Sequence, residues 1–130
     1  MAKIDFLKKR AEEFLDTAEY HFKKRMYHLV AFDLEQALQL YLKYTLALKL
    51  RNFPPTHSLK ELLRAIGKAY KKEKEIKKII NENIHLIANL EQAYITSRYL
   101  PAEFTKREVE ELEKFSKELI KWVKKLWLKV

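Results

Sequence analysis

An arginine between two tyrosines is the strongest candidate for binding chemistry in this sequence. Arg98 follows Tyr94 by four residues and directly precedes Tyr99, near the end of a predicted helix. A planar guanidinium beside aromatic rings suits a phosphate, with a base stacked nearby. The alternative is a structural arginine, which caps helix carbonyls or pairs with an acid such as Glu103.

Two further sets of polar residues are candidate sites. His57 precedes Ser58, which forms a capping pattern with Glu61, and the free amides of a helix N-terminus favour an anion. Packing beside this cap is the alternative role for His57. Gln36 and Lys43 are seven residues apart, so they share one face of a helix that is otherwise apolar. We expect this pair to line a groove or to take part in a dimer interface.

The familiar catalytic and metal-binding patterns are missing. The chain has no Cys, which excludes a thiolate nucleophile, a cysteine zinc site and a disulfide scaffold. A single Gly excludes the glycine-rich loops that cradle phosphates. The four His do not recur with carboxylates at a metal-ligand spacing. We therefore expect no catalytic residue, no metal ligand and no cofactor.

The elements that carry these residues read as helices throughout. Apolar residues recur every three or four positions, and the three Pro and one Gly are too few for the turns of a β-sandwich or barrel. Ser58 with Glu61 and Thr105 with Glu108 form capping patterns at two helix starts. The pattern predicts one all-α domain over 1–130, an antiparallel up-and-down bundle of four long helices and one short helix. Breaks are expected near residues 23–28, 51–57, 71–74 and 99–105.

The charge is unbalanced, with 27 Lys+Arg against 18 Asp+Glu and a net charge of +9. Residues 58–82 sum to +4 and residues 114–130 to +5, whereas residues 83–113 sum to −3. Such an excess attracts anions, among them nucleic acids, nucleotides and acidic protein surfaces. Abundant Lys and Glu without Cys also resembles a thermophile's surface, although the same composition suits any long-helix protein.

Two further expectations concern location and assembly. The first twenty residues lack a signal-peptide pattern, and no apolar run reaches the length of a membrane span, so we expect a cytoplasmic protein without membrane contact. The seven Phe, seven Tyr and two Trp exceed what we expect a four-helix core to enclose. Exposed apolar surface of this kind predicts a two-fold homodimer.

Three segments together resemble the HEPN domain family (higher eukaryotes and prokaryotes nucleotide-binding). Residues 31–38 read AFDLEQAL, residues 55–59 read PTHSL, and residues 94–101 read YITSRYLP. They are similar, in order and spacing, to the family's A-x-F-x-x-Q-Q-A, T-H-D/S-L and Y-x-x-S/T-R-Y-P patterns. The sequence departs from these patterns at Glu35, where the family has Gln, and at Leu100, which is inserted before Pro101.

The resemblance implies a helical dimer that binds a nucleotide or RNA at Arg98, Tyr94, Tyr99 and His57. It also implies a minimal nucleotidyltransferase as partner, in a toxin–antitoxin-like pair. Some members are metal-independent RNases with an R-x(4–6)-H motif. Arg51 and His57 match this spacing, but across a proline loop, and no His follows Arg98. RNase activity and a purely structural interaction subunit are the alternatives.

Overall fold

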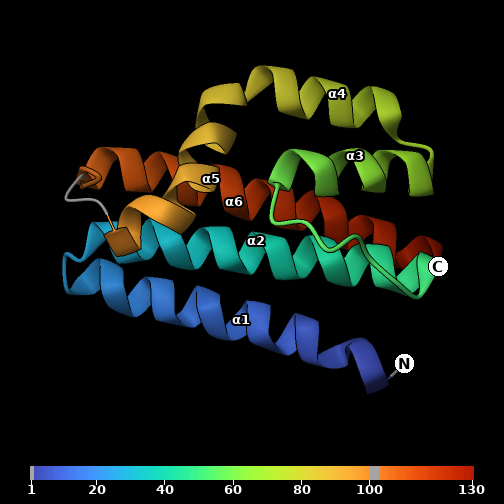
Figure 1. Cartoon of the computed structure of the whole chain (residues 1–130), viewed down its shortest axis with the longest axis horizontal. Coiled ribbons are helices and arrows are strands. Elements are labelled where there is room, and N and C mark those ends of the chain that lie inside the picture. Colours follow the sequence, from blue (N-terminus) through green and yellow to red (C-terminus); the bar gives the residue numbers. More distant parts are fainter. Residues whose placement is uncertain (1, 100–102) are drawn as a thin grey trace.

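The chain folds into helices only, as the sequence predicts (Figure 1). The computed structural model describes the backbone of residues 2–99 and 103–130, and their side chains except those of residues 2, 3 and 96–98. No strand occurs in these ranges. The helices are α1 (Ala2–Lys23), α2 (Tyr27–Leu50), α3 (Leu59–Tyr70), α4 (Glu73–Glu82), α5 (Ile84–Tyr99) and α6 (Lys106–Leu126), followed by a short 3₁₀ turn, η1 (Trp127–Lys129).

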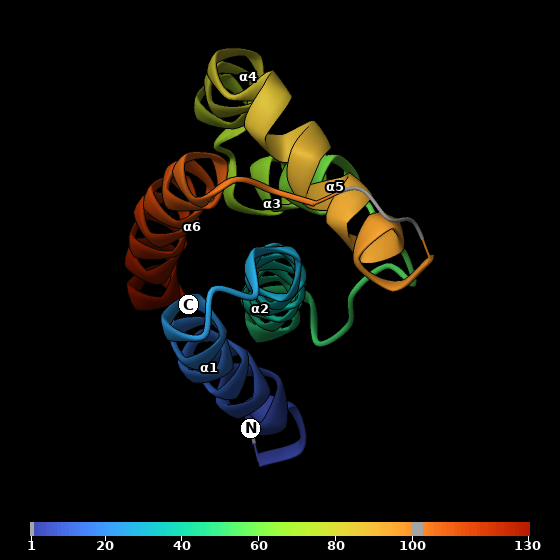
Figure 2. The same ribbon diagram turned by 90° about the vertical axis from the view of Figure 1, so that its left-hand side faces the viewer.

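Helix α2 is the centre of the fold. The end-on view in Figure 2 shows it surrounded by the other helices, and it packs against α1, α3, α5 and α6. Helix α4 lies outermost, where it covers α3 (Figures 1 and 2). Because α2 packs against four other helices, fourteen of its residues are buried, and they include Asp33, Glu35 and Gln39. The core is therefore built around one helix that carries both apolar and polar side chains.

The turn between α1 and α2 is tight and lies within the break predicted near residues 23–28. Arg25 adopts a left-handed conformation with φ 61°, and the Met26 amide donates to the His21 carbonyl at 2.9 Å. The side chains of His21 and Asp33 then join the two helices at 2.6 Å. Burial raises the pKa of Asp33, and the hydrogen bond and charge of His21 oppose that rise. This pair fixes how α1 lies along α2.

Thr45 connects three distant parts of the chain inside the core. The Tyr70 hydroxyl, at the end of α3, donates to the Thr45 carbonyl at 2.6 Å. The indole Nε1 of Trp127 donates to the Thr45 Oγ1 at 2.8 Å. Because buried polar groups need hydrogen-bond partners, these contacts set where α3 and the C-terminal turn meet α2.

The predicted helix class is confirmed, but the predicted count of four long helices and one short helix is wrong. The apolar pattern from Ile76 to Tyr94 predicts one continuous helix, whereas the structure divides it into α4 and α5 at Asn83. The Asn83 side chain donates to the Ile79 carbonyl at 2.9 Å, so this backbone carbonyl near the C-terminus of α4 has a hydrogen-bond partner. The break lets α5 turn from α4 towards α2 (Figure 1).

Both predicted N-terminal caps form, one of them only in part. At α6, Thr105 accepts from the Glu108 amide and Glu108 accepts from the Thr105 amide, which completes a capping box. At α3, Ser58 accepts from the Glu61 amide at 3.3 Å, but its own amide donates to the Thr56 hydroxyl. Among the described helices, none is long and apolar enough to cross a membrane.

The single glycine explains how closely α3 and α4 pack. A Cβ placed on Gly67 would lie 3.1 Å from the Ile76 Cγ1 and 3.3 Å from the Glu73 Cα. Contacts this short leave no room for a larger side chain unless α4 moves away. Glycine costs about 1 kcal/mol relative to Ala inside a helix. The close approach of α4 is the reason for glycine at this position.

We expect Gly67→Leu to destabilise the fold by about 1–3 kcal/mol, because the side chain would push α4 off α3. Lys68→Leu is the matched control, since Lys68 is exposed on the same helix. Urea denaturation followed by circular dichroism measures both free energies of unfolding. Equal stability of the two variants would show that the α3–α4 contact does not require glycine.

Candidate functional site

A network of polar side chains lies where α2 meets the start of α3. Gln36 Nε2 donates to Glu35 Oε1 at 2.7 Å, and Gln39 Nε2 donates to Glu35 Oε2. The His57 Nδ1 lies 3.2 Å from Gln39 Oε1. The network thus runs from a fully buried carboxylate, through a buried amide, to an exposed imidazole.

The direction of these hydrogen bonds selects the tautomer of the neutral imidazole. Gln39 uses its amide NH₂ towards Glu35, so its oxygen faces His57 and can only accept. His57 Nδ1 is therefore the donor. In the neutral ring the proton sits on Nδ1, and Nε2 keeps its lone pair for an external partner.

The imidazole of His57 also stacks on Tyr94 of α5. The two ring centroids are 5.2 Å apart and the rings are inclined by 20°. His57 is exposed and Tyr94 is half-buried, so the pair presents aromatic surface at the edge of the fold. Offset stacking of this kind is favourable by about 0.5–1.5 kcal/mol beyond the area that it buries.

Glu91 of α5 occupies the N-terminus of α3. Its Oε2 accepts from the Ser58 hydroxyl and from the Leu59 amide, both at 2.9 Å. The anion that the free amides of this helix end favour is therefore a carboxylate of the chain itself. Glu91 in this way fixes the position of His57, one residue before the cap.

Burial controls the charge of this network. Desolvation raises the pKa of Glu35 to about 7, although the hydrogen bonds from Gln39 and Gln36 act to lower it. The charge of Glu91 adds to the rise and that of Lys43 opposes it. Burial also lowers the pKa of Lys43, whose charge lies 5.5 Å from the centre of the Phe53 ring. Near neutral pH, Glu35 is thus poised between its two protonation states.

The structure brings together two of the four predicted ligand-binding residues, His57 and Tyr94. Tyr99 is 74% exposed at the end of α5, and the side chain of Arg98 lies outside the described residues. The predicted pair on α2 has internal partners, because Gln36 binds Glu35 and Lys43 lies over Phe53. A groove or interface role for that pair stays a prediction.

Sequence reasoning missed Glu35, Gln39 and Glu91. The signal for the first two was available, because they are polar residues one turn apart in a helix with apolar residues all around. Glu91 had no local signal, since its partners are 32 and 33 residues away. Among the described residues, no three His, Asp or Glu side chains are grouped so that they could hold a metal ion.

Glu35→Gln is expected to change how stability depends on pH. The folded chain holds the proton of Glu35 more tightly than the unfolded chain does, so this group stabilises the fold at low pH. That contribution is lost as the pH rises from about 4.5 through about 7, and it amounts to about 3 kcal/mol at most. Relative to the native chain, Glu35→Gln should gain stability over this range.

Urea denaturation at a series of pH values between 4 and 8 measures this slope. Glu19→Gln, which removes an exposed carboxylate on α1, is the matched control. If both variants follow the slope of the native chain, Glu35 is not the group that titrates.

Comparison with known proteins supports the resemblance drawn from the three segments. The family model described as HEPN domain matches residues 4–126. Searches of curated proteins and of solved structures found no match. The matched range includes α2, the connection before α3, and α5, which together supply the side chains of the polar network. This chain therefore belongs to the HEPN domain family.

Proposed function

We propose that this HEPN domain binds a nucleotide or a segment of RNA at the surface formed by His57 and Tyr94. The stacked, solvent-facing pair is the observation that carries the proposal. One face of the imidazole rests on the tyrosine ring, and a nucleobase can stack on the other face. Base stacking on aromatic side chains is favourable by about 1–3 kcal/mol per base and accepts any base.

The phosphate contact in this proposal is Arg98. It follows Tyr94 by four residues in α5, so its backbone lies one helical turn beyond the stacked pair. A guanidinium at that position can make two parallel hydrogen bonds to a phosphate. The net charge of +9 adds a long-range attraction for the same ligands.

Variants of the stacked pair test the proposal. We expect His57→Ala and Tyr94→Ala each to weaken binding about tenfold, because each removes a stacking ring. Arg98→Ala should remove the phosphate contact, and Arg98→Lys should restore it only in part. His85→Ala, at an exposed position of α5, is the control.

Fluorescence anisotropy with labelled ATP and with a single-stranded RNA of roughly ten nucleotides measures these affinities. Thermal melting of every variant separates lost binding from lost folding. If His57→Ala and Tyr94→Ala leave the affinity for ATP and for RNA unchanged, the ligand binds elsewhere. If Arg98→Ala and Arg98→Lys both lose several kcal/mol of stability, that arginine is structural.

A second candidate function is metal-independent RNA cleavage. The orientation of Gln39 favours it, because the Nε2 of neutral His57 is left unprotonated and can accept a proton from a ribose hydroxyl. Arg51 lies at the opposite end of the α2–α3 connection, as the C-cap of α2. RNA cleavage that persists in chelator and disappears in His57→Ala would establish this activity over simple binding.

We also propose a two-fold homodimer, with a minimal nucleotidyltransferase as a further partner of toxin–antitoxin type. The dimer is supported by one face of α5, where Ile84, Ile95 and Tyr99 are 44%, 54% and 74% exposed. Their spacing places them on one side of the helix. The partner is supported by family resemblance, and co-purification with a nucleotidyltransferase encoded beside this gene tests it.

Light scattering after size-exclusion chromatography tests the dimer. At micromolar concentration we expect twice the mass of one chain. Ile95→Glu should give the monomer mass with little change in melting temperature, because this side chain contributes to the surface and not to the core. Leu128→Glu adds the same charge at an exposed apolar position outside α5 and should leave the dimer intact. A native chain of monomer mass would contradict the proposal.

A further inference from the structure

One end of the helical bundle is strongly basic. Three segments form it: residues 48–51 at the end of α2, residues 68–75 around the α3–α4 connection, and residues 124–130 at the C-terminal turn (Figure 1). We call these three segments the basic end. They hold nine Lys and Arg against two Glu, a net charge of +7, whereas the rest of the chain sums to only +2. Most of the net charge of the protein is therefore gathered at this end.

Aromatic contacts hold the three segments beside one another. The Nζ of Lys49 lies 4.8 Å from the centre of the Tyr70 ring, so the end of α2 meets the end of α3. The Trp127 ring lies 4.9 Å from the Tyr44 ring, and its Nε1 donates to Thr45, so the C-terminal turn also meets α2. The two basic stretches found in the sequence thus converge on one surface of the folded chain.

The aromatic rings at this end are occupied by neighbours of the chain itself. Tyr44 and Tyr70 are buried. Trp127 is half-buried, with Tyr41 stacked on its ring and the Lys124 Nζ 5.9 Å from its centre. Single-stranded nucleic acids bind proteins by stacking bases on aromatic rings. A nucleic acid would therefore find cations here, but these rings would not serve as a stacking platform.

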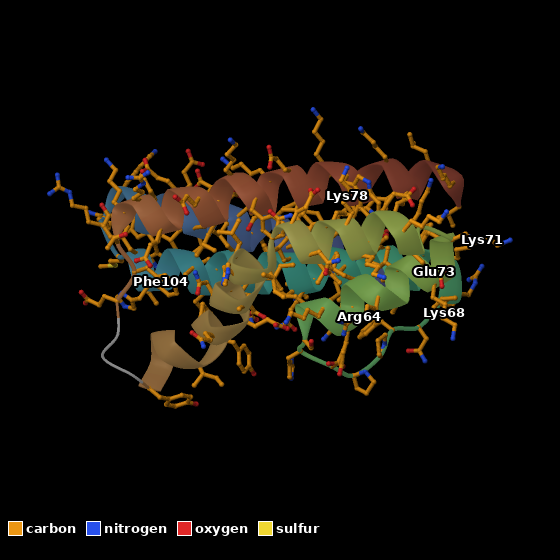
Figure 3. All side chains as sticks on the ribbon, turned by 90° about the horizontal axis from the view of Figure 1, so that it is seen from above. Arg64, Lys68, Lys71, Glu73, Lys78 and Phe104 are labelled. Carbon is orange, nitrogen blue, oxygen red and sulfur yellow. The ribbon has the colours of Figure 1, made fainter. Side chains whose placement is uncertain are left out.

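Aliphatic side chains protrude among the cations instead. Leu50, at the end of α2, is 53% exposed, and Leu128 and Val130 are 88% and 60% exposed. Lys71, on the α3–α4 connection, points outward at the same end (Figure 3). The basic end thus presents apolar surface and positive charge together.

We propose that the basic end binds the surface of an anionic lipid membrane. The lysine ammonium groups would meet the lipid headgroups, while Leu50 and Leu128 would enter the boundary between headgroups and acyl chains. Both parts of the surface are then used, since anionic headgroups attract the cations and the apolar side chains hold the contact. A lipid surface is fluid and adapts to protruding side chains, whereas a protein partner requires a complementary shape.

A peripheral contact of this kind uses surface residues only. The sequence-based expectation of no membrane contact rests on the lack of a long apolar run, which bears on membrane-spanning segments. The cations and aliphatic residues of the basic end come from three separate segments, so they meet only in the folded chain. Binding of the full chain to vesicles decides between the two.

Sedimentation with vesicles tests the proposal. We expect the chain to bind vesicles of phosphatidylcholine with about one third phosphatidylserine, and not vesicles of phosphatidylcholine alone. Lys71→Glu/Lys125→Glu should weaken binding to the anionic vesicles about tenfold or more. Lys23→Glu/Lys106→Glu makes the same change in net charge at exposed positions of the opposite end (Figure 1). This control should stay within about twofold of the native chain, because salt screens charges so far from the lipid.

Variants of the aliphatic residues test the other half of the surface. Leu50→Ser and Leu128→Ser should each weaken binding about fivefold at unchanged charge. Met26→Ser, which removes a side chain 42% exposed at the opposite end, should leave binding unchanged. Lys71→Gln/Lys125→Gln removes charge without reversing it, and should weaken binding even if the double reversal does not fold. Circular dichroism melting of each variant checks the fold.

Three results would overturn the proposal. The first is a native chain that does not bind the anionic vesicles at low ionic strength. The second is normal binding by the charge variants or by the leucine variants. The third is a single-stranded RNA that binds more tightly than the vesicles and loses affinity in the charge variants but not in the leucine variants. In that case the basic end is a nucleic-acid surface.

Discussion

The burial of most of α2 is the constraint on which the rest of the structure depends. A helix that packs against α1, α3, α5 and α6 has few solvent-facing positions on which to place polar residues. Those that it carries must find partners inside the fold, because an unpaired buried polar group costs about 1–3 kcal/mol. Asp33 finds His21, Thr45 finds Trp127, and Glu35 finds two glutamines. The first two pairs fix a neighbouring segment against α2, and Gln39 in turn contacts His57 in the connection before α3.

The same constraint builds the candidate site. Because Glu35 is buried, its pKa rises to about 7, and its charge becomes sensitive to the groups around it. Gln39 contacts both Glu35 and His57. Glu91 and Tyr94 then hold the start of α3 and the imidazole from the side of α5. A buried acid and an exposed ring thus belong to one hydrogen-bonded unit.

Two surfaces with different chemistry follow from this arrangement. The stacked rings of His57 and Tyr94 lie where α5 passes the start of α3. On the outer side of α3, the pocket between α3 and α4 is lined by the basic side chains of Arg64, Lys68 and Lys77. The break at Asn83 serves both, since it ends α4 beside α3 and lets α5 cross to α2.

The sequence by itself determined the helical class, the positions of most helix ends and the residues of both caps. These features depend on apolar periodicity, on prolines and on capping side chains, all of which act within a few residues of the chain. It also identified His57 and Tyr94 as candidates, through family resemblance. Only the tertiary structure decided that they stack, that Glu91 caps α3 and that Glu35 is buried. These contacts join residues more than thirty positions apart or depend on what surrounds α2, so no local pattern could specify them.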